Sequence, residues 1–338
     1  METFLQKLAP LLRLTRISTA FAAVANLWFV VLWTRGVEAE RLNAAARNAT
    51  EPIVAPSLPI VPLLGATLAA VGLFAFATAL NDTLDRRRDR ALHPERPIPS
   101  GAVAVETASM LVAVALLCAF LGSMLLGNAA VLLCLITAGG ALLFHTAAKY
   151  VPAVGLVLLG LIYGAHMLVG NGALLFVWPV WLQMTHALVV GAVTHRLAGR
   201  RPRLTPFALT AAALGWAFWS AVLLGVGWLR NGALWPDFVP WFAAAVPVGL
   251  SLVFAAFVRL KLGKVRSRTL AAEKVQRYGS LWMPLYAIAW CVPMWNVEGA
   301  SLRPATVVLG VLAILGLLGM TLLRELYSLA EHPVGFRR

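Results

Sequence analysis

Long apolar runs recur along almost the entire chain, and they restrict the possible folds more than any other feature of the sequence. The run from Ile60 to Leu80, for example, contains no charged residue and is long enough to cross the hydrocarbon core of a bilayer as an α-helix. Because the chain is 60% hydrophobic and only 12% charged, a soluble globular fold is excluded. We predict an all-α polytopic membrane bundle with ten spans, at residues 17–34, 60–80, 103–126, 129–147, 152–170, 174–194, 205–228, 239–258, 279–297 and 304–323.

The positions of the basic residues predict how these spans are oriented. If the N-terminus is cytoplasmic, 23 of the 28 Lys and Arg residues fall on the cytoplasmic side and 5 fall on the other side. Short cytoplasmic loops of membrane proteins carry an excess of Lys and Arg. We therefore expect an integral, multi-pass protein of a bacterial-type inner or plasma membrane, surrounded by membrane lipid. The same topology accounts for the net charge of +14, so we expect no nucleic-acid partner.

A polar stretch of unusual composition follows the second span. Three of the chain's four aspartates, Asp82, Asp85 and Asp89, lie here, directly after Asn81. Acidic side chains at a membrane boundary are costly unless they face a wet cavity, bind a cation or pair with one another. On a continuing helix, Asn81, Asp85 and Asp89 share one face because they recur every four residues. Since Mg²⁺ is commonly held by carboxylates together with substrate phosphates, we predict a Mg²⁺–diphosphate site at the cytoplasmic surface.

Two linked motifs carry a resemblance to a known family. The stretch from Asn81 to Asp89, followed by Arg96-Pro97-Ile98-Pro99-Ser100-Gly101, resembles the first aspartate motif and the next loop of the UbiA-type membrane prenyltransferases. That family carries N-D-x-x-D-x-x-x-D and then R-P-[IL]-x-S-G at the end of its second span, and both motifs stand here in that order. Weaker matches extend the resemblance over roughly residues 10–297: Leu14-Thr15-Arg16, Lys149 with Gly160 and Gly164, and Tyr278-Gly279.

The resemblance implies a fold and an activity. The fold is a UbiA-like bundle of nine core transmembrane helices in a single domain that covers residues 1–338, and the span at about 304–323 becomes a tenth, additional helix. The activity is the transfer of a prenyl chain from an isoprenyl diphosphate, bound through Mg²⁺, to a small lipophilic or aromatic acceptor.

The same resemblance assigns roles to individual side chains. It makes Asn81 and Asp85 the metal ligands, with Asp82 and Asp89 as supports beside them. Arg96 and Lys149 are then expected to neutralise the diphosphate. Such cations are needed because the leaving group gains negative charge as the allylic C–O bond ionises.

The chain departs from the family pattern at the second aspartate motif. Family members carry an acidic motif near the end of the sixth span, whereas this chain has no Asp or Glu between residues 106 and 237. We expect Arg196, together with Lys149, to supply the positive charge that a second metal would bring, because arginine binds phosphate bidentately. His186 and His195 are further candidates as metal ligands, although histidines near helix ends are more often packing residues.

Three functions remain open from the sequence. The first is a divergent prenyltransferase that works with one Mg²⁺ and the substitute cations. The second is a non-catalytic isoprenoid-binding or lipid-transport protein that keeps the same fold and has lost the second metal site. The third is an unrelated transporter in which the aspartates form an ordinary cytoplasmic loop.

Overall fold

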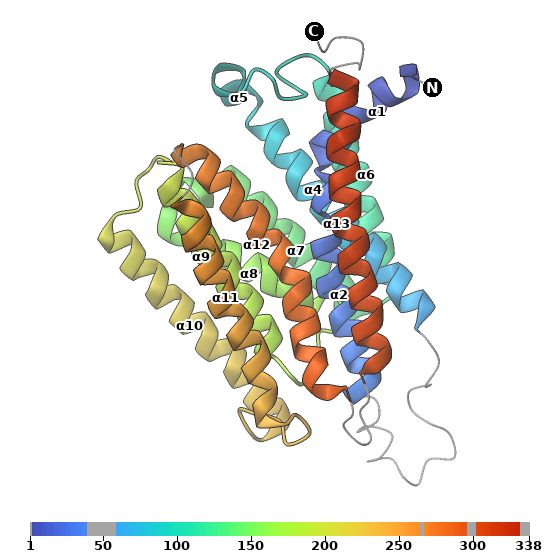
Figure 1. Ribbon diagram of the computed structural model, residues 1–338, viewed down its shortest axis with the longest axis vertical. Helices are drawn as coiled ribbons and strands as arrows, with labels where there is room; N and C mark the ends of the chain where they lie inside the picture. Colours follow the sequence, from blue (N-terminus) through green and yellow to red (C-terminus); the bar gives the residue numbers. More distant parts are fainter. Residues whose placement is uncertain (1, 39–58, 264–266, 296–301, 332–338) are drawn as a thin grey trace.

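The molecule is a bundle of long helices (Figure 1). The computed structural model describes residues 2–38, 59–263, 267–295 and 302–331, and all regular secondary structure in these ranges is helical. Ten long helices each overlap one predicted span, so the predicted fold class is confirmed. They are α2 (Phe21–Trp33), α4 (Ile60–Leu84), α6 (Val105–Met124), α7 (Asn128–Thr146), α8 (Pro152–Leu168), α9 (Trp178–Leu197), α10 (Pro206–Asn231), α11 (Ala245–Leu262), α12 (Arg268–Cys291) and α13 (Arg303–Glu331).

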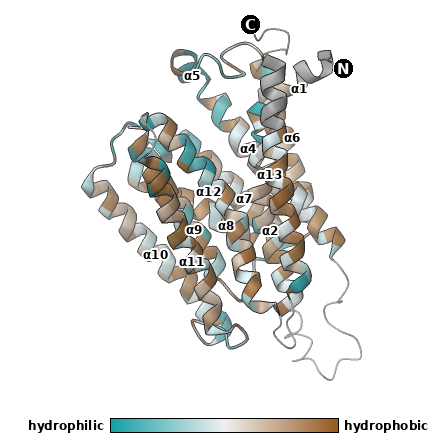
Figure 2. Ribbon diagram, viewed as in Figure 1, coloured by the Kyte–Doolittle hydropathy of each residue, from teal (hydrophilic) through white to brown (hydrophobic). Residues whose placement is uncertain are grey.

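The distribution of hydropathy identifies an integral, multi-pass membrane protein. Among the described residues, six helices are long and apolar enough to cross a bilayer, namely α4, α6, α7, α10, α11 with its preceding turn, and α13. The outer side of α10 presents large apolar side chains such as Leu214, Phe218 and Leu229 to the surroundings. Figure 2 shows hydrophobic residues along most of the helices, as a bundle that spans the hydrocarbon layer requires.

The closest helix packing is between α4 and α6, and it depends on small residues. A Cβ atom placed on Gly122 would lie 2.4 Å from the backbone nitrogen of Ala69, and one on Gly72 would lie 2.5 Å from that of Ala119. Small residues let membrane helices approach in this way, which increases van der Waals contact where lipid offers no hydrophobic driving force. This contact fixes α4, whose far end carries the aspartates.

Two span boundaries differ from the prediction for physical reasons. The first span begins as α2 at Phe21, because Arg16 adopts the left-handed conformation (φ 47°) and a 3₁₀ turn (Ile17–Thr19) follows it. The ninth begins as α12 at Arg268, before the predicted residue 279, because its first turns are charged and hydropathy does not register a helix outside the apolar layer.

A buried polar seam joins α2, α9 and α12 inside the bundle. The amide of Gln183 donates to the Oδ1 atom of Asn26 at 3.0 Å. On the same face of α9, His186 Nε2 lies 3.0 Å from the carbonyl oxygen of Gly279, and its Nδ1 lies 3.4 Å from the hydroxyl of Tyr286. Since both ring nitrogens have protein partners, His186 acts as a packing residue here and not as a metal ligand.

Candidate functional site

The aspartate motif lies where α4 ends. Asp85 has a ψ of 1°, which separates α4 from the short helix α5 (Arg86–Leu92). The i→i+4 hydrogen bonds nevertheless continue across the break, with Asp85 N to Asn81 O at 2.9 Å and Asp89 N to Asp85 O at 2.8 Å. The aspartates of the motif nevertheless pair with different cations and so form two ion-paired groups.

Asp82 and Asp89 form the first group and share Arg96. The guanidinium of Arg96 lies 2.6 Å from Asp89 Oδ2 and 3.7 Å from Asp82 Oδ1. Arg16 binds the same Asp82 oxygen at 3.2 Å, and the amide of Asn81 donates to it at 3.0 Å. Both aspartates are buried, with exposed fractions of 5% and 3%. Burying a carboxylate at a membrane boundary costs free energy unless the charge is paired. Both of these carboxylates have cationic partners that reduce this desolvation cost.

The loop after α5 folds so that Arg96 reaches back to the motif. Backbone hydrogen bonds from Ser100 N to Arg96 O at 2.9 Å and from Val103 N to Pro97 O at 2.9 Å close consecutive turns. Gly101 has a φ of +80°, a conformation in which glycine pays no steric cost. The R-P-x-x-S-G sequence thus forms a series of turns that positions the guanidinium of Arg96 beside the aspartates.

Asp85 and Lys149 form the second group. Lys149 Nζ lies 2.7 and 2.8 Å from the two carboxylate oxygens, and each side chain is 14% exposed. Lys149 is held in a 3₁₀ turn (Ala148–Tyr150) between α7 and α8. Gly155 on α8 permits this turn to pack closely, because a Cβ there would lie 2.7 Å from the carbonyl oxygen of Ala148.

Arg200 interacts electrostatically with three arginines at the site, namely Arg16, Arg88 and Arg96. Arg196 is exposed in the last turn of α9, and within the described ranges no hydrogen bond or ion pair joins it to the cluster. Arg200 follows the end of α9. Its surface is exposed, yet surrounding protein desolvates the guanidinium enough to lower its pKa, and the positive charges of Arg88, Arg16 and Arg96 lower the pKa further. Sequence reasoning missed Arg200 and Arg16 as site residues, because their proximity arises from long-range packing.

The remaining candidates have ordinary contacts or lie at the edge of the cluster. His195 Nε2 lies 2.9 Å from the carbonyl oxygen of Pro202, outside the cluster. Arg86, which follows Asp85 in the motif, donates to the carbonyl oxygen of Thr83 at 2.9 Å. His145, near the end of α7, interacts electrostatically with Lys149 and Asp85, and its Nδ1 is buried without a hydrogen-bond partner among the described residues.

The oxygen atoms of the motif are suitable ligands for a magnesium ion. In the structure, however, the aspartates are paired with arginine and lysine side chains. Asn81 and the three aspartates offer oxygen atoms, which hard divalent cations prefer. No group of three or more His, Cys, Asp or Glu side chains in the described part of the chain is arranged to hold a metal. Both oxygens of Asp85 face Lys149, so ligation of a metal by Asp85 requires Lys149 to move away from at least one of them.

A family model identifies the family of the chain, and solved structures share its fold. The model of the UbiA prenyltransferase family matches residues 52–261. A structure of digeranylgeranylglyceryl phosphate synthase aligns with a TM-score of 0.56 at 17% identity, over 85% of this chain and 98% of that chain. The apo structure of a UbiA homologue from Aeropyrum pernix K1 aligns with a TM-score of 0.50 at 20% identity, over 81% and 96% of the two chains. At these identities the structural matches show a shared fold alone. No curated protein matches the chain.

Proposed function

The chain belongs to the UbiA prenyltransferase family, and we propose from that premise that it binds an isoprenyl diphosphate at the charged cluster and transfers the prenyl chain to a small lipophilic or aromatic acceptor. The cluster consists of Asn81, Asp82, Asp85, Asp89, Arg16, Arg88, Arg96, Lys149 and Arg200.

An excess of positive charge carries this proposal. Arg16, Arg96 and Lys149 already balance the three aspartates through ion pairs. Arg200 and Arg88 add further positive charge. Desolvation of the Arg200 guanidinium lowers its pKa, and repulsion by Arg88, Arg16 and Arg96 lowers that pKa further. Like charges that converge in this way favour binding of a polyanion, and a diphosphate at a membrane surface meets that requirement.

The reaction follows from what these side chains can do. Asn81 and Asp85 would hold Mg²⁺, which when bound supplies charge neutralisation for the diphosphate oxygens. Lys149 Nζ lies within hydrogen-bond distance of Asp85, so it can transfer its hydrogen bonds from the carboxylate to a diphosphate oxygen by a small side-chain movement. Arg96 and Arg200 would stabilise the leaving diphosphate, which departs with the electron pair of the allylic C–O bond. In this proposal Arg200 takes the role predicted for Arg196.

A non-catalytic isoprenoid-binding protein is the second candidate, and one observation favours it. The last turn of α9 carries Thr194, His195 and Arg196 where the family pattern has carboxylates, so a second metal has no acidic ligands there. Such a protein would bind the same diphosphate through the same arginines without breaking the C–O bond.

Binding of labelled geranyl, farnesyl and geranylgeranyl diphosphate to the detergent-purified protein tests the proposal. We expect binding that depends on Mg²⁺ and is lost in Asp85→Ala. Arg200→Ala should weaken binding by about 10- to 100-fold, because a hydrogen bond to a charged group contributes about 1.5–3 kcal/mol. Arg196→Ala is the matched control and should bind as the wild type does.

Release of inorganic diphosphate separates the two candidates. Release that requires an acceptor, from a mixture of quinone precursors and lipid alcohols, would establish transfer, because hydrolysis by water would release diphosphate without one. Stable binding without release would establish the carrier. Binding that is indifferent to Mg²⁺, Asp85 and Arg200 would rule out both.

A further inference from the structure

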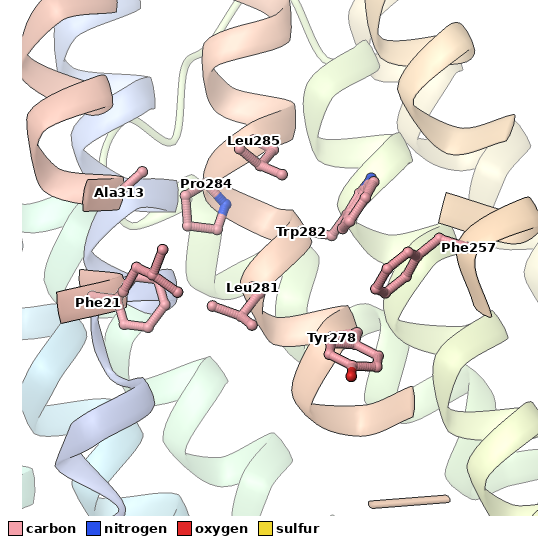
Figure 3. Close-up of a pocket in the computed structure, with 9 residues that line it drawn as sticks. Phe21, Phe257, Tyr278, Leu281, Trp282, Pro284, Leu285 and Ala313 are labelled. Atoms are coloured by element: carbon pink, nitrogen blue, oxygen red, sulfur yellow. The ribbon is translucent and has the colours of Figure 1, made fainter. Parts of the chain in front are cut away.

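An apolar groove lies on the flank of the bundle between α11 and α13 (Figure 3). Its volume is about 270 Å³. Phe257 of α11 and Trp282 of α12 form one wall, Ala313 and Leu317 of α13 form the other, and Phe21 of α2 lies beside α13. This volume is slightly below the usual range for a complete small-molecule site, so it suits a single hydrocarbon chain.

The aromatic wall of the groove is preformed. The rings of Phe257 and Tyr278 meet edge to face with centroids 4.9 Å apart, and those of Phe257 and Trp282 stack at 5.9 Å. Trp282 is fixed further by a hydrogen bond of 3.1 Å from its Nε1 to the carbonyl oxygen of Leu250. Side chains held in this way do not have to be ordered when a ligand binds, which favours binding.

Basic side chains lie on α11 and α12 near one end of the groove. Lys261 Nζ lies 5.4 Å from the ring centroid of Phe257, on the last turn of α11. On α12, Lys274 and Arg277 are exposed and precede the lining residues Tyr278 and Leu281 by four positions, so they continue the same helix face towards the charged end of the bundle. Figure 3 shows the Tyr278 hydroxyl pointing out of the groove at its edge.

We propose that this groove binds an anionic phospholipid, with one acyl chain between α11 and α13 and the phosphate headgroup at Lys261, Lys274 and Arg277. The groove lies between α11 and α13, which are both long and apolar enough to cross a bilayer, so a hydrocarbon chain is the available occupant. Basic side chains at the end of such a groove recognise anionic headgroups, whereas a zwitterionic headgroup offers no net charge to attract them. The site is independent of the charged cluster and does not require the proposed transferase activity.

Native mass spectrometry of the detergent-purified protein with equal amounts of phosphatidylglycerol and phosphatidylcholine tests this proposal. We expect the wild type to retain phosphatidylglycerol preferentially. The double variant K261Q/R277Q should lose about fivefold in retention of phosphatidylglycerol for each base removed, the contribution of a basic residue near an anionic lipid surface. The matched control, R201Q/R203Q, removes two exposed arginines elsewhere and should keep the preference.

A steric variant tests the position of the chain. Ala313→Phe fills the groove and should reduce retention of both lipids, whereas Ile314→Phe, on the exposed side of α13, should have no effect. Equal retention of the two lipids by the wild type, or a preference that survives K261Q/R277Q, would overturn the proposal. Displacement of phosphatidylglycerol by farnesyl diphosphate, in a manner dependent on Lys261, would also overturn it, because the groove would then belong to the substrate.

Discussion

At the scale of single residues, the ion pair of Lys149 and Asp85 has two roles. It stabilises the fold, and in the proposed function both residues also take part in binding the diphosphate and its Mg²⁺. Lys149→Met removes the partner of a carboxylate that is only 14% exposed. We expect the variant to lose about 2–4 kcal/mol of stability, because breaking a buried ion pair leaves an uncompensated charge. The midpoint of thermal unfolding in detergent measures the loss.

The double variant K149M/D85N separates the two roles of this pair. Since it has no unpaired charge, we expect it to recover most of the lost stability while remaining unable to bind an isoprenyl diphosphate. A double variant as unstable as K149M would show that Lys149 stabilises the fold through contacts other than Asp85.

At the scale of elements, the contact between α4 and α6 determines where the aspartates stand. Gly122→Ala places a Cβ 2.4 Å from the backbone nitrogen of Ala69, so the helices must separate. We expect a loss of about 1–3 kcal/mol, the usual cost of overpacking. Gly139→Ala in α7 is the control, because a Cβ there meets nothing within 4 Å, and it should be neutral or slightly stabilising.

Thermal unfolding and diphosphate binding should respond together to the change at Gly122. A Gly122→Ala protein that unfolds like the wild type would mean that α6 can move away from α4 without cost. Diphosphate binding would then show whether the end of α4 tolerates that movement.

The helices were predictable from sequence to different degrees, and the reasons are physical. Spans such as α4 and α6 are uncharged in their centres, so hydropathy locates them within a few residues. The start of α12 was missed because a charged helix continues beyond the apolar layer, and the start of α2 was missed because Arg16 breaks the helix with a positive φ. Neither feature changes the hydropathy of the apolar part of the helix, which is the part that the prediction detects.

At the scale of the whole molecule, the distribution of Lys and Arg predicts a cytoplasmic location for the charged end of the bundle. We expect green fluorescent protein fused after Arg203 to fluoresce in a bacterial host, and alkaline phosphatase fused after Asp237 to be active. Phosphatase activity of a fusion after Arg203 would show that the topology is the opposite of the predicted one. The diphosphate would then have to be supplied from outside the cell.

The candidate site was predictable in part. The Asp82, Asp85 and Asp89 motif, Arg96 and Lys149 were selected from sequence. The structure pairs Arg96 with Asp82 and Asp89, and Lys149 with Asp85. The contributions of Arg16 and Arg200 were not predictable, because each depends on how distant helices pack and not on a local pattern. Arg196 and Arg200 are only four positions apart in the sequence. Their surroundings differ because Arg196 lies in the last turn of α9 and Arg200 lies in the segment that follows the helix.

The ion pair between Asp85 and Lys149 also has a consequence for biosynthesis. The two residues are 64 positions apart, so Asp85 leaves the ribosome well before its partner. At about 5–20 residues per second, this interval lasts roughly 3–13 seconds. During that time Asp85 stands at the edge of an incomplete bundle, and water or the insertion machinery has to accommodate it. Nascent chains stalled after Asp89 but before Lys149 should therefore be degraded more readily than chains stalled after α8, because they carry Asp85 without the lysine that neutralises it.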